Sequence, residues 1–377
     1  MKYYIIAGEA SGDLHAHNLM KAIQKKDPDA KFRFWGGDLM KSVSCDIVTH
    51  YKEMAFMGFW EVFKNLSTVL GNIRRCKQDI LNHKPDVLIL VDYPGFNLRI
   101  AKFAKKHKIQ IVYYISPQIW AWKKGRIKKI KRDVDEMMVI LPFEKDFYAK
   151  YGMSVHYVGH PLLDAVAKDL LADPKVVNFR NNHYLFDKEV VALLPGSRKQ
   201  EIEAILPKML KIVPLFPQYQ FVVSTVSWLD QSLYSRYITD SNVKTVKDET
   251  YALIANSKAA IVASGTATLE TALIGIPQVV CYAGSEISYL IAKNLISGIS
   301  YISLVNLIMN KKVVSELIQH DLNTEKLSYE LKQIVDNEDN ILSIKNNYEK
   351  LYSLLGNGST SEKAAEIVIQ AARKNNL

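Results

Sequence analysis

The chain has 377 residues, with 48% hydrophobic residues, 23% charged residues and a formal net charge of +10. This composition is ordinary for a globular protein with a buried core, and the length favours two domains. No apolar run reaches the roughly 18 residues of a spanning helix, so we expect no transmembrane segment. The short apolar N-terminus ends at Gly8 and Glu9, which argues against a signal peptide.

Two further features of the composition narrow the class of protein. The three cysteines, Cys45, Cys76 and Cys281, lie far apart. They suit a reducing cytosol and argue against a thiolate zinc site. All of the excess positive charge falls within residues 1–170. A basic first half indicates an anionic partner, which could be nucleic acid, anionic lipid or a phosphorylated substrate.

The first half alternates short apolar strands with amphipathic helices. We expect strands at 3–7, 32–35, 87–91, 111–115 and 137–141, with helices such as 14–26 and 98–107 between them. This rhythm predicts a parallel sheet covered on both faces.

The second half repeats the rhythm. We expect strands at 190–194, 221–225, 260–263 and 279–282, helix-like stretches that include 207–216 and 267–275, and a final helix at 361–375. Residues 170–188 lack periodicity and contain Pro174, which favours a linker. The fold class is therefore α/β, with two Rossmann-like parallel-sheet domains facing a cleft. We place the domains at 1–168 and 169–357, and expect the C-terminal helix, about 358–377, to pack back on the first domain.

Two strand-to-helix turns in the second domain carry phosphate-binding features. In the first, Gly196 and Ser197 free backbone N–H groups, and Arg198 can offset charge on a leaving diphosphate. The alternative is a turn that binds nothing.

The second turn is Ser264, Gly265 and Thr266. Glu270 follows one helical turn later, where its carboxylate can accept both ribose hydroxyls. Neither turn is a P-loop. Two such turns in one domain favour phosphate and ribose binding.

A glycine-containing loop also follows the first strand, and it includes Ser11, Gly12 and Asp13. It is not GxGxxG, so a nicotinamide or flavin cofactor is not supported. His15 follows in the first turn of the helix. The alternative interpretation is a helix start with Asp13 as the N-cap.

Asp92 lies at the carboxyl end of the strand 87–91, where a side chain faces the expected cleft. A glycosyl transfer needs one base to take the proton of the attacking hydroxyl, and Asp92 is the first candidate. Glu9, Asp13 and His15 compete for this role. The alternative is a turn or N-cap aspartate before the next helix.

Aromatic and basic residues gather in 116–132. Gln118, Trp120, Trp122 and Lys123 open a run of lysines and arginines. The tryptophans can stack on sugar or lie at a bilayer interface. No nucleic-acid-binding module accompanies the run, so we expect no nucleic-acid partner; a solvated basic face is the other alternative. Asp133 and Asp135 form a DxD that follows no strand, which we interpret as surface charge balance rather than a metal site.

An aromatic stripe at helical spacing lies in 56–73. It comprises Phe56, Phe59, Trp60, Phe63, Leu66, Leu70 and Ile73. Such stripes are usually core, but the aromatic content and the basic residues beside it favour lipid or bilayer contact.

As a set, these motifs resemble those of the lipid-A-disaccharide synthases, glycosyltransferase family 19. The resemblance covers nearly the whole chain: AGEASGD at 7–13, MAFMGFWEV at 54–62, DYPGFN at 92–97, SPQIWAWK at 116–123, LPFEKDFY at 141–148, GHP at 159–161, LLPGSR at 193–198, ASGTATLE at 263–270 and VNL at 305–307.

The resemblance implies a glycosyltransferase-B fold and a metal-independent, inverting transfer. The donor would be UDP-2,3-diacylglucosamine and the acceptor 2,3-diacylglucosamine 1-phosphate, giving the β-1,6-linked disaccharide 1-phosphate and UDP. It also implies a peripheral location on the phospholipid of the inner membrane, at the cytoplasmic face, in a Gram-negative bacterium. A homodimer is compatible with the sequence, which does not fix the oligomeric state.

By motif position, the resemblance implies Asp92 as the base, Arg198 near the diphosphate, and Glu270 and Asn306 around the nucleotide. It places the Glu9–Asp13 loop in the cleft. We assign Ser11, Gly12 and Asn97 to contact with the acceptor or the membrane. Three positions depart from the family pattern: Gly95 replaces a frequent aspartate, Lys123 a common arginine and Val305 a frequent proline.

Two other classes of function fit parts of the sequence. One is another enzyme of the same fold, either a UDP-N-acetylglucosamine 2-epimerase or a transferase for a different lipid acceptor. The other is a non-catalytic protein that binds nucleotide sugars or membranes. An epimerase acts on a soluble sugar and does not require the stripe in 56–73.

Overall fold

The computed structural model describes residues 1–54, 66–121, 124–166, 170–284, 300–356 and 358–374. The chain divides into two compact units. Unit 1 comprises Met1–Asp164 and Asn357–Leu377, and unit 2 comprises Ala165–Gly356. The C-terminal helix therefore groups with the first unit, and the sequence had placed the division after residue 168.

The described residues of unit 1 form a seven-stranded parallel sheet in the order β3-β2-β1-β4-β5-β6-β7. Its strands are β1 (Lys2–Ala7), β2 (Lys31–Gly36), β3 (Ile47–His50), β4 (Val87–Val91), β5 (Gln110–Tyr114), β6 (Glu136–Val139) and β7 (His156–Tyr157). Its helices are α1 (Ala10–Lys26), α2 (Asp38–Lys41), α3 (Tyr51–Met54), α5 (Leu66–His83), α6 (Pro94–Lys106), η1 (Lys124–Arg126), α7 (Ile127–Asp133), α8 (Pro142–Ala149), α9 (Leu162–Ala165) and α20 (Thr360–Lys374).

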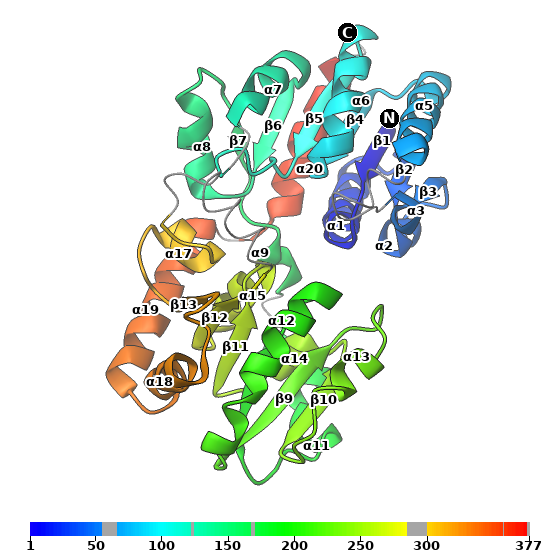
Figure 1. Cartoon of the computed structure of the whole chain (residues 1–377). Coiled ribbons are helices and arrows are strands. Elements are labelled where there is room, and N and C mark those ends of the chain that lie inside the picture. The colour runs from blue at the N-terminus through cyan, green and yellow to red at the C-terminus, as the bar shows by residue number, and fades with distance from the viewer. Residues whose placement is uncertain (55–65, 122–123, 167–169, 285–299, 357, 375–377) are drawn as a thin grey trace. The chain divides into compact units, whose positions relative to one another are not determined.

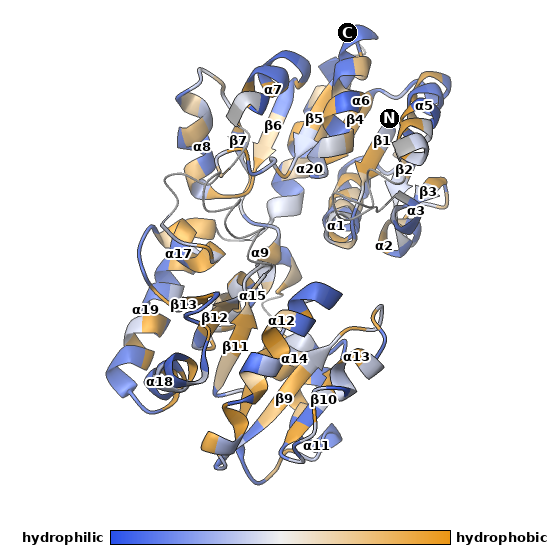
Figure 2. Ribbon diagram, viewed as in Figure 1, coloured by the Kyte–Doolittle hydropathy of each residue, from blue (hydrophilic) through white to orange (hydrophobic). Residues whose placement is uncertain are grey.

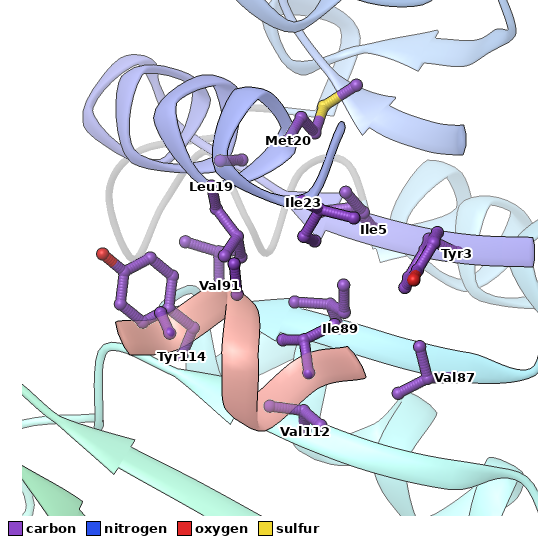
Figure 3. Close-up of a cluster of buried hydrophobic side chains, with 14 of the residues drawn as sticks. Tyr3, Ile5, Leu19, Met20, Ile23, Val87, Ile89, Val91, Val112 and Tyr114 are labelled. Carbon is purple, nitrogen blue, oxygen red and sulfur yellow. The ribbon is translucent and has the colours of Figure 1, made fainter. Parts of the chain in front are cut away.

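Helices cover both faces of this sheet, because alternate strand residues point to opposite faces. Tyr3 and Ile5 pack with α1 and α20, whereas Tyr4 and Ile6 pack with α5, α6 and α7. Figure 3 shows the first cluster, in which side chains of β1, β4 and β5 lie beside α1 and the salmon-coloured α20. The central strand β4 is apolar throughout (Figure 2), as a strand buried on both faces requires.

The described residues of unit 2 form a six-stranded parallel sheet in the order β10-β9-β8-β11-β12-β13. Its strands are β8 (Glu189–Leu194), β9 (Tyr219–Thr225), β10 (Val243–Lys247), β11 (Ala259–Ala263), β12 (Gln278–Tyr282) and β13 (Ser315–Ile318). Its helices are η2 (Leu170–Ala172), α10 (Pro174–Val177), α11 (Phe179–Asn182), α12 (Lys199–Leu210), η3 (Val213–Leu215), α13 (Ser232–Ser235), α14 (Thr250–Ala255), α15 (Thr266–Ile274), α17 (Leu304–Met309), α18 (Thr324–Val335) and α19 (Glu338–Leu355). Residues of α10, α11 and α14 pack on one face of the sheet, and α12 and α18 contact each other and β11 (Figure 1).

Each expected strand is present within two residues of its expected ends. Three helices differ. Helices α1 and α6 begin at Ala10 and Pro94 rather than at 14 and 98. Helix α12 contains Pro207 and ends at Leu210, so the stretch 207–216 is α-helical only in its first part. The presumed linker at 170–188 contains the short helices α10 and α11. Among the helices in the described ranges, none has the length and apolarity needed to cross a membrane.

Candidate functional site

The strand order of both sheets predicts where a ligand binds. In unit 1 the order reverses between β1 and β4, and in unit 2 between β8 and β11. In open parallel sheets, the crevice outside the carboxyl ends of such a strand pair is the usual ligand site. The loops that follow these four strands contain Glu9, Asp92, Arg198 and Ser264, so each unit brings candidate residues to its own crossover point.

Asp92 follows β4 directly and has an unusual backbone. Both Asp92 and Tyr93 are left-handed, with φ of 44° and 46°. This conformation costs a non-glycine residue on the order of 1 kcal/mol. The carbonyl oxygen of Asp92 accepts hydrogen bonds from Asn97 Nδ2 at 2.8 Å and from the Tyr113 hydroxyl at 2.5 Å. Strain held in place by specific contacts is typical of functional sites.

The side chain of Asp92 is also perturbed. Burial and the charge of Glu9 raise the pKa of its carboxyl to about 6, while the Tyr93 N–H opposes the rise. Because a general base works best with a pKa near the working pH, Asp92 is suited to proton abstraction.

Glu9 lies in the turn after β1, the strand that pairs with β4. A Cβ at Gly8 would lie 2.3 Å from the Tyr93 ring, so only glycine allows the two turns to pack this closely. The structure therefore brings Glu9 and Asp92 together, as two of the four candidate bases.

Asp13, the third candidate base, has a different environment. Its carboxylate accepts hydrogen bonds from the N–H groups of Gly37 at 2.7 Å, Leu39 at 3.1 Å and Met40 at 3.2 Å. It thus caps the start of α2, and since α1 begins at Ala10 it is not the N-cap of α1. Asp13 is buried, and its oxygens are occupied by backbone N–H groups.

His15, the fourth candidate base, interacts electrostatically with Asp164 and His160. Burial lowers the pKa of His15 to about 4 against the opposing charge of Asp164. The pKa of His160 is lowered to about 3 by burial and by repulsion from His15. The imidazole Nδ1 of His15 is buried and has no hydrogen-bond partner in the described part of the chain. At neutral pH it is therefore an uncharged side chain packed near Asp164.

Three other residues of these loops, which we predicted to contact the acceptor or the membrane, differ in how deeply they are buried. Ser11 is exposed at the start of α1, whereas Gly12 is buried against Ala7. Asn97 is fully buried and holds the carbonyl oxygens of Val91 and Asp92. Asn97 therefore acts on the backbone of the candidate base.

The aromatic segment after β5 is only partly described. Gln118 is exposed, and Trp120 packs edge-to-face on Phe143 at 4.9 Å between ring centroids. Trp122 and Lys123 lie outside the described residues.

The DxD at Asp133 and Asp135 is not simple surface charge balance, and that interpretation was wrong for Asp133. Asp133 is buried, and it accepts two 2.6 Å hydrogen bonds from the guanidinium of Arg132. Asp135 accepts from the Ile111 N–H at 3.0 Å and forms an ion pair with Lys105. Both carboxylates thus stabilise unit 1.

The stripe in 56–73 falls mostly outside the described residues, which exclude Phe56, Phe59, Trp60 and Phe63. Leu66 is the first residue of α5. The described side chains differ in exposure: Leu70 is 47% exposed, whereas Ile73 is 6% exposed and belongs to the core. The C-terminal end of the stripe is therefore core, and Leu70 faces solvent.

In unit 2, the turn after β8 is preorganised by one carboxylate. Gly196 is left-handed, with φ of 110°. Glu201 accepts from the Ser197 N–H at 3.2 Å and from Arg198 Nη1 at 3.3 Å. The side chain of Arg198 is 61% exposed at the start of α12. The sequence analysis missed Glu201 as the partner of these two donors, although Glu201 lies about one helical turn after Ser197.

The turn after β11 leads into α15, with Gly265 as its N-cap and Thr266 in the first turn. Gly265 and Thr266 are exposed, and Glu270 is partly buried. Burial raises the pKa of Glu270 to about 7, against a hydrogen bond from Tyr251. Tyr251 comes from α14, so no local pattern in the sequence could have identified this partner.

Asn306 is fully buried at the start of α17. Its Oδ1 accepts from the N–H groups of Val313 at 2.7 Å and Val314 at 3.0 Å. Its Nδ2 donates to the Val314 carbonyl at 2.9 Å and to Glu316 at 2.8 Å. These four bonds fill the capacity of the amide. The side chain of Asn306 is therefore fully hydrogen-bonded within unit 2.

Within the described ranges, no group of three or more histidine, cysteine, aspartate or glutamate side chains is arranged to hold a metal ion.

Two doubly wound parallel sheets with polar groups at each crossover define a protein of the glycosyltransferase-B type. Solved structures agree on this fold. The UDP-GlcNAc 2-epimerase of Neisseria meningitidis, bound to UDP-GlcNAc, has a TM-score of 0.67 at 14% identity and covers 99% of this chain and 100% of its own. The calicheamicin glycosyltransferase has a TM-score of 0.59 at 12% identity, covering 99% and 98%.

Sequence comparison identifies the family within this class. The model of the lipid-A-disaccharide synthetase family matches residues 3–371. The lipid-A-disaccharide synthase of Syntrophus aciditrophicus is 40% identical, covering 98% of this chain and 97% of its own, and that of Geobacter metallireducens is 36% identical over 98% and 97%. The chain belongs to the lipid-A-disaccharide synthetase family, and it is a glycosyltransferase that forms the lipid A disaccharide.

Proposed function

We propose that the chain transfers 2,3-diacylglucosamine from UDP-2,3-diacylglucosamine to 2,3-diacylglucosamine 1-phosphate, with Asp92 as the base. One observation carries the assignment of Asp92: it has a raised pKa and a strained backbone at the central crossover of unit 1. Glu9 is the second carboxylate at the same crossover.

The carboxylate of Asp92 takes the proton of the acceptor 6-hydroxyl as its oxygen attacks the anomeric carbon. The new carbon–oxygen bond forms on the face opposite the nucleotide. The bond to the β-phosphate oxygen breaks, and UDP leaves with the electron pair. The products are the β-1,6-linked disaccharide 1-phosphate and UDP, with inversion at the anomeric carbon.

We assign the donor to unit 2. The N-termini of α12 and α15 offer backbone N–H groups to phosphate, and Arg198 adds a cation beside one of them. Glu270 can accept the ribose hydroxyls. In this proposal, these groups stabilise the charge on the departing UDP without a metal.

We assign the acceptor to unit 1 and place the enzyme at the cytoplasmic face of the inner membrane, since both sugars carry acyl chains. Lys128, Lys129 and Lys131 are exposed on α7, while Ile127 and Ile130 on the same helix enter the core. A basic face of this kind attracts anionic phospholipid. Leu70 on α5 supplies exposed apolar surface.

The transfer is tested by measuring UDP release with and without the acylated acceptor. We expect release only with the acceptor, and at least about a hundredfold lower turnover for Asp92→Asn and Arg198→Ala. Circular dichroism checks that both variants are folded. Release that ignores the acceptor, with interconversion of UDP-N-acetylglucosamine and its 2-epimer, would support the epimerase alternative instead.

Membrane attachment is tested by co-sedimentation with phosphatidylglycerol vesicles at low and high salt. We expect binding that weakens with salt, because exposed charges are screened. The charge-reversed variant Lys128→Glu/Lys129→Glu should bind less. Leu70→Ser should also bind less. Leu342→Ser, which alters a more exposed leucine on α19 of unit 2, should not (59% against 47% exposed). Absence of wild-type binding at both salt concentrations would contradict the proposal.

A further inference from the structure

A single carboxylate in unit 2 accepts four hydrogen bonds. Oε1 of Glu316, on β13, accepts from the Ser303 N–H at 2.9 Å, the Ser303 hydroxyl at 2.7 Å and Asn306 Nδ2 at 2.8 Å. Oε2 accepts from the Ile302 N–H at 3.0 Å. Ser303 and Asn306 are fully buried, whereas Ile302 and Glu316 are partly buried. Charge-assisted bonds to a carboxylate are the stronger kind, and four of them on one side chain restrain their donors.

The same carboxylate orders the start of α17. The Ser303 hydroxyl donates to Glu316 and accepts from the Asn306 N–H at 3.2 Å, which makes Ser303 the N-cap of this helix. All four hydrogen-bonding positions of the Asn306 amide are used within the protein. Through Ser303 and Asn306, Glu316 therefore helps to fix the backbone at the start of α17 and at Val313 and Val314.

This backbone borders the nucleotide turn after β11. The Ser264 hydroxyl donates to the Ile302 carbonyl at 3.4 Å, and Glu316 holds the N–H of that same residue. Helices α15 and α17, which begin beside Ser264 and Ser303, are in contact, and α17 lies near β13 in Figure 1. A chain of direct contacts therefore leads from Glu316 through Ile302 to Ser264.

We infer that Glu316 is a positioning residue for donor binding, which fixes the Ser264 turn through Ile302 and the start of α17. The inference rests on the proposed placement of the nucleotide at Ser264–Glu270. Glu316 itself does not touch the ligand; its carboxylate sets the position of Ser264 and of the α15 N-terminus that receive it. Asn306, which donates to the same carboxylate, is part of this hydrogen-bond network.

Glu316→Gln is a sharp test, because the amide keeps only one acceptor oxygen. With that oxygen in place of Oε1, the NH₂ group faces the Ile302 N–H, and two donors meet. The variant thus breaks the link to Ile302 and retains the links to Ser303 and Asn306. Glu330→Gln is the matched control, since Glu330 on α18 accepts from the hydroxyl of Ser315, the residue before Glu316, at 2.6 Å.

The readouts are the dissociation constant of UDP by calorimetry, the thermal midpoint, and kcat and KM for the donor. We expect Glu316→Gln to weaken UDP binding by about tenfold and to raise the donor KM with little change in kcat, while Glu330→Gln stays within about twofold. UDP binding that is unchanged in Glu316→Gln, or weakened equally in Glu330→Gln, overturns the inference.

Two further variants keep the result decisive. If Glu316→Gln does not fold, Ser303→Ala is used instead. It removes two bonds, the one from the hydroxyl to Glu316 and the N-cap bond from the Asn306 N–H, and it should weaken UDP binding about threefold; no change overturns the inference. Glu270→Gln tests the nucleotide turn itself. If Glu270→Gln weakens UDP binding and Glu316→Gln does not, only the positioning role fails. If Glu270→Gln binds UDP like the wild type, the proposed donor site fails and the inference with it.

Discussion

Glu9 and Asp92 follow the two strands that pair at the centre of the unit 1 sheet, and the charge of Glu9 adds to burial in raising the pKa of Asp92. Two carboxylates with one raised pKa form a common arrangement for acid–base work. Here the pair comes from different turns, and the contact between Gly8 and Tyr93 holds these turns together.

The pH dependence of turnover should report this pair. Asp92 must be deprotonated to act as a base, so kcat/KM should fall as the pH drops through about 6. In Glu9→Gln the repulsion between the carboxylates is lost, and the acidic limb should move to lower pH. The measurement is a pH–rate profile of UDP release. An acidic limb that stays in place in Glu9→Gln would show that Glu9 does not act on Asp92.

The close packing at Gly8 should be intolerant of a methyl group. Gly8→Ala places a carbon 2.3 Å from the Tyr93 ring and should destabilise the protein by about 1–3 kcal/mol, with loss of turnover because Tyr93 is adjacent to Asp92. Gly95→Ala is the control, because a Cβ there meets no heavy atom within 4 Å. It should be neutral or stabilising. Thermal unfolding and turnover are measured on both; equal behaviour would disprove the packing argument.

Asp13 should matter for stability rather than for proton transfer. Asp13→Ala removes the acceptor for three backbone N–H groups at the start of α2 and should cost about 1–3 kcal/mol in urea unfolding. Asp29→Ala, at an exposed position, should cost little. If Asp13→Ala is as stable as the wild type but loses as much turnover as Asp92→Asn, Asp13 is again a candidate base.

The buried His160 should make the protein sensitive to acid. Its pKa is about 3 in the folded protein, against an ordinary value of 6.5, so the unfolded chain takes up the proton first as the pH falls. The stability is fully present above 6.5 and is lost as the pH falls toward 3. Between pH 7.5 and 5 the free energy of unfolding should drop by about 2 kcal/mol from this group.

His160→Asn tests this effect, because an amide oxygen can accept from the Leu162 N–H as Nδ1 of His160 does at 3.2 Å. The variant should lose about 2 kcal/mol less than the wild type over the same pH range in urea unfolding. Equal losses would assign the acid sensitivity to other groups, such as His15.

The central strands could be predicted from the sequence because each contains a run of buried hydrophobic residues. The strands that were missed are β3, β7, β10 and β13, and these are the outer strands of the two sheets. An outer strand buries fewer side chains, as in β10, where Lys244 and Thr245 are only partly buried or exposed. Without a continuous apolar run, a short strand resembles a loop.

The candidate site was predictable to the extent that its residues directly follow strands. Asp92, Arg198 and Ser264 could be found in this way, since parallel strands bring their carboxyl ends to one edge. The roles of Asp13 and Asn306 could not, because their partners, Gly37 and Glu316, come from other loops and strands. Composition alone cannot show whether a buried carboxylate or amide already has its hydrogen bonds.

Helix α20 has a consequence for how the protein is made. Its apolar residues Ala364, Ala365 and Val368 complete the core around β1, β4 and β5, and Asp164 binds the N–H groups of Thr360 at 3.2 Å and Ser361 at 2.9 Å. The ribosome adds this part of unit 1 only after the whole of unit 2. Until α20 is made, the apolar face under it lies open to chaperones and proteases, although the rest of unit 1 has already emerged.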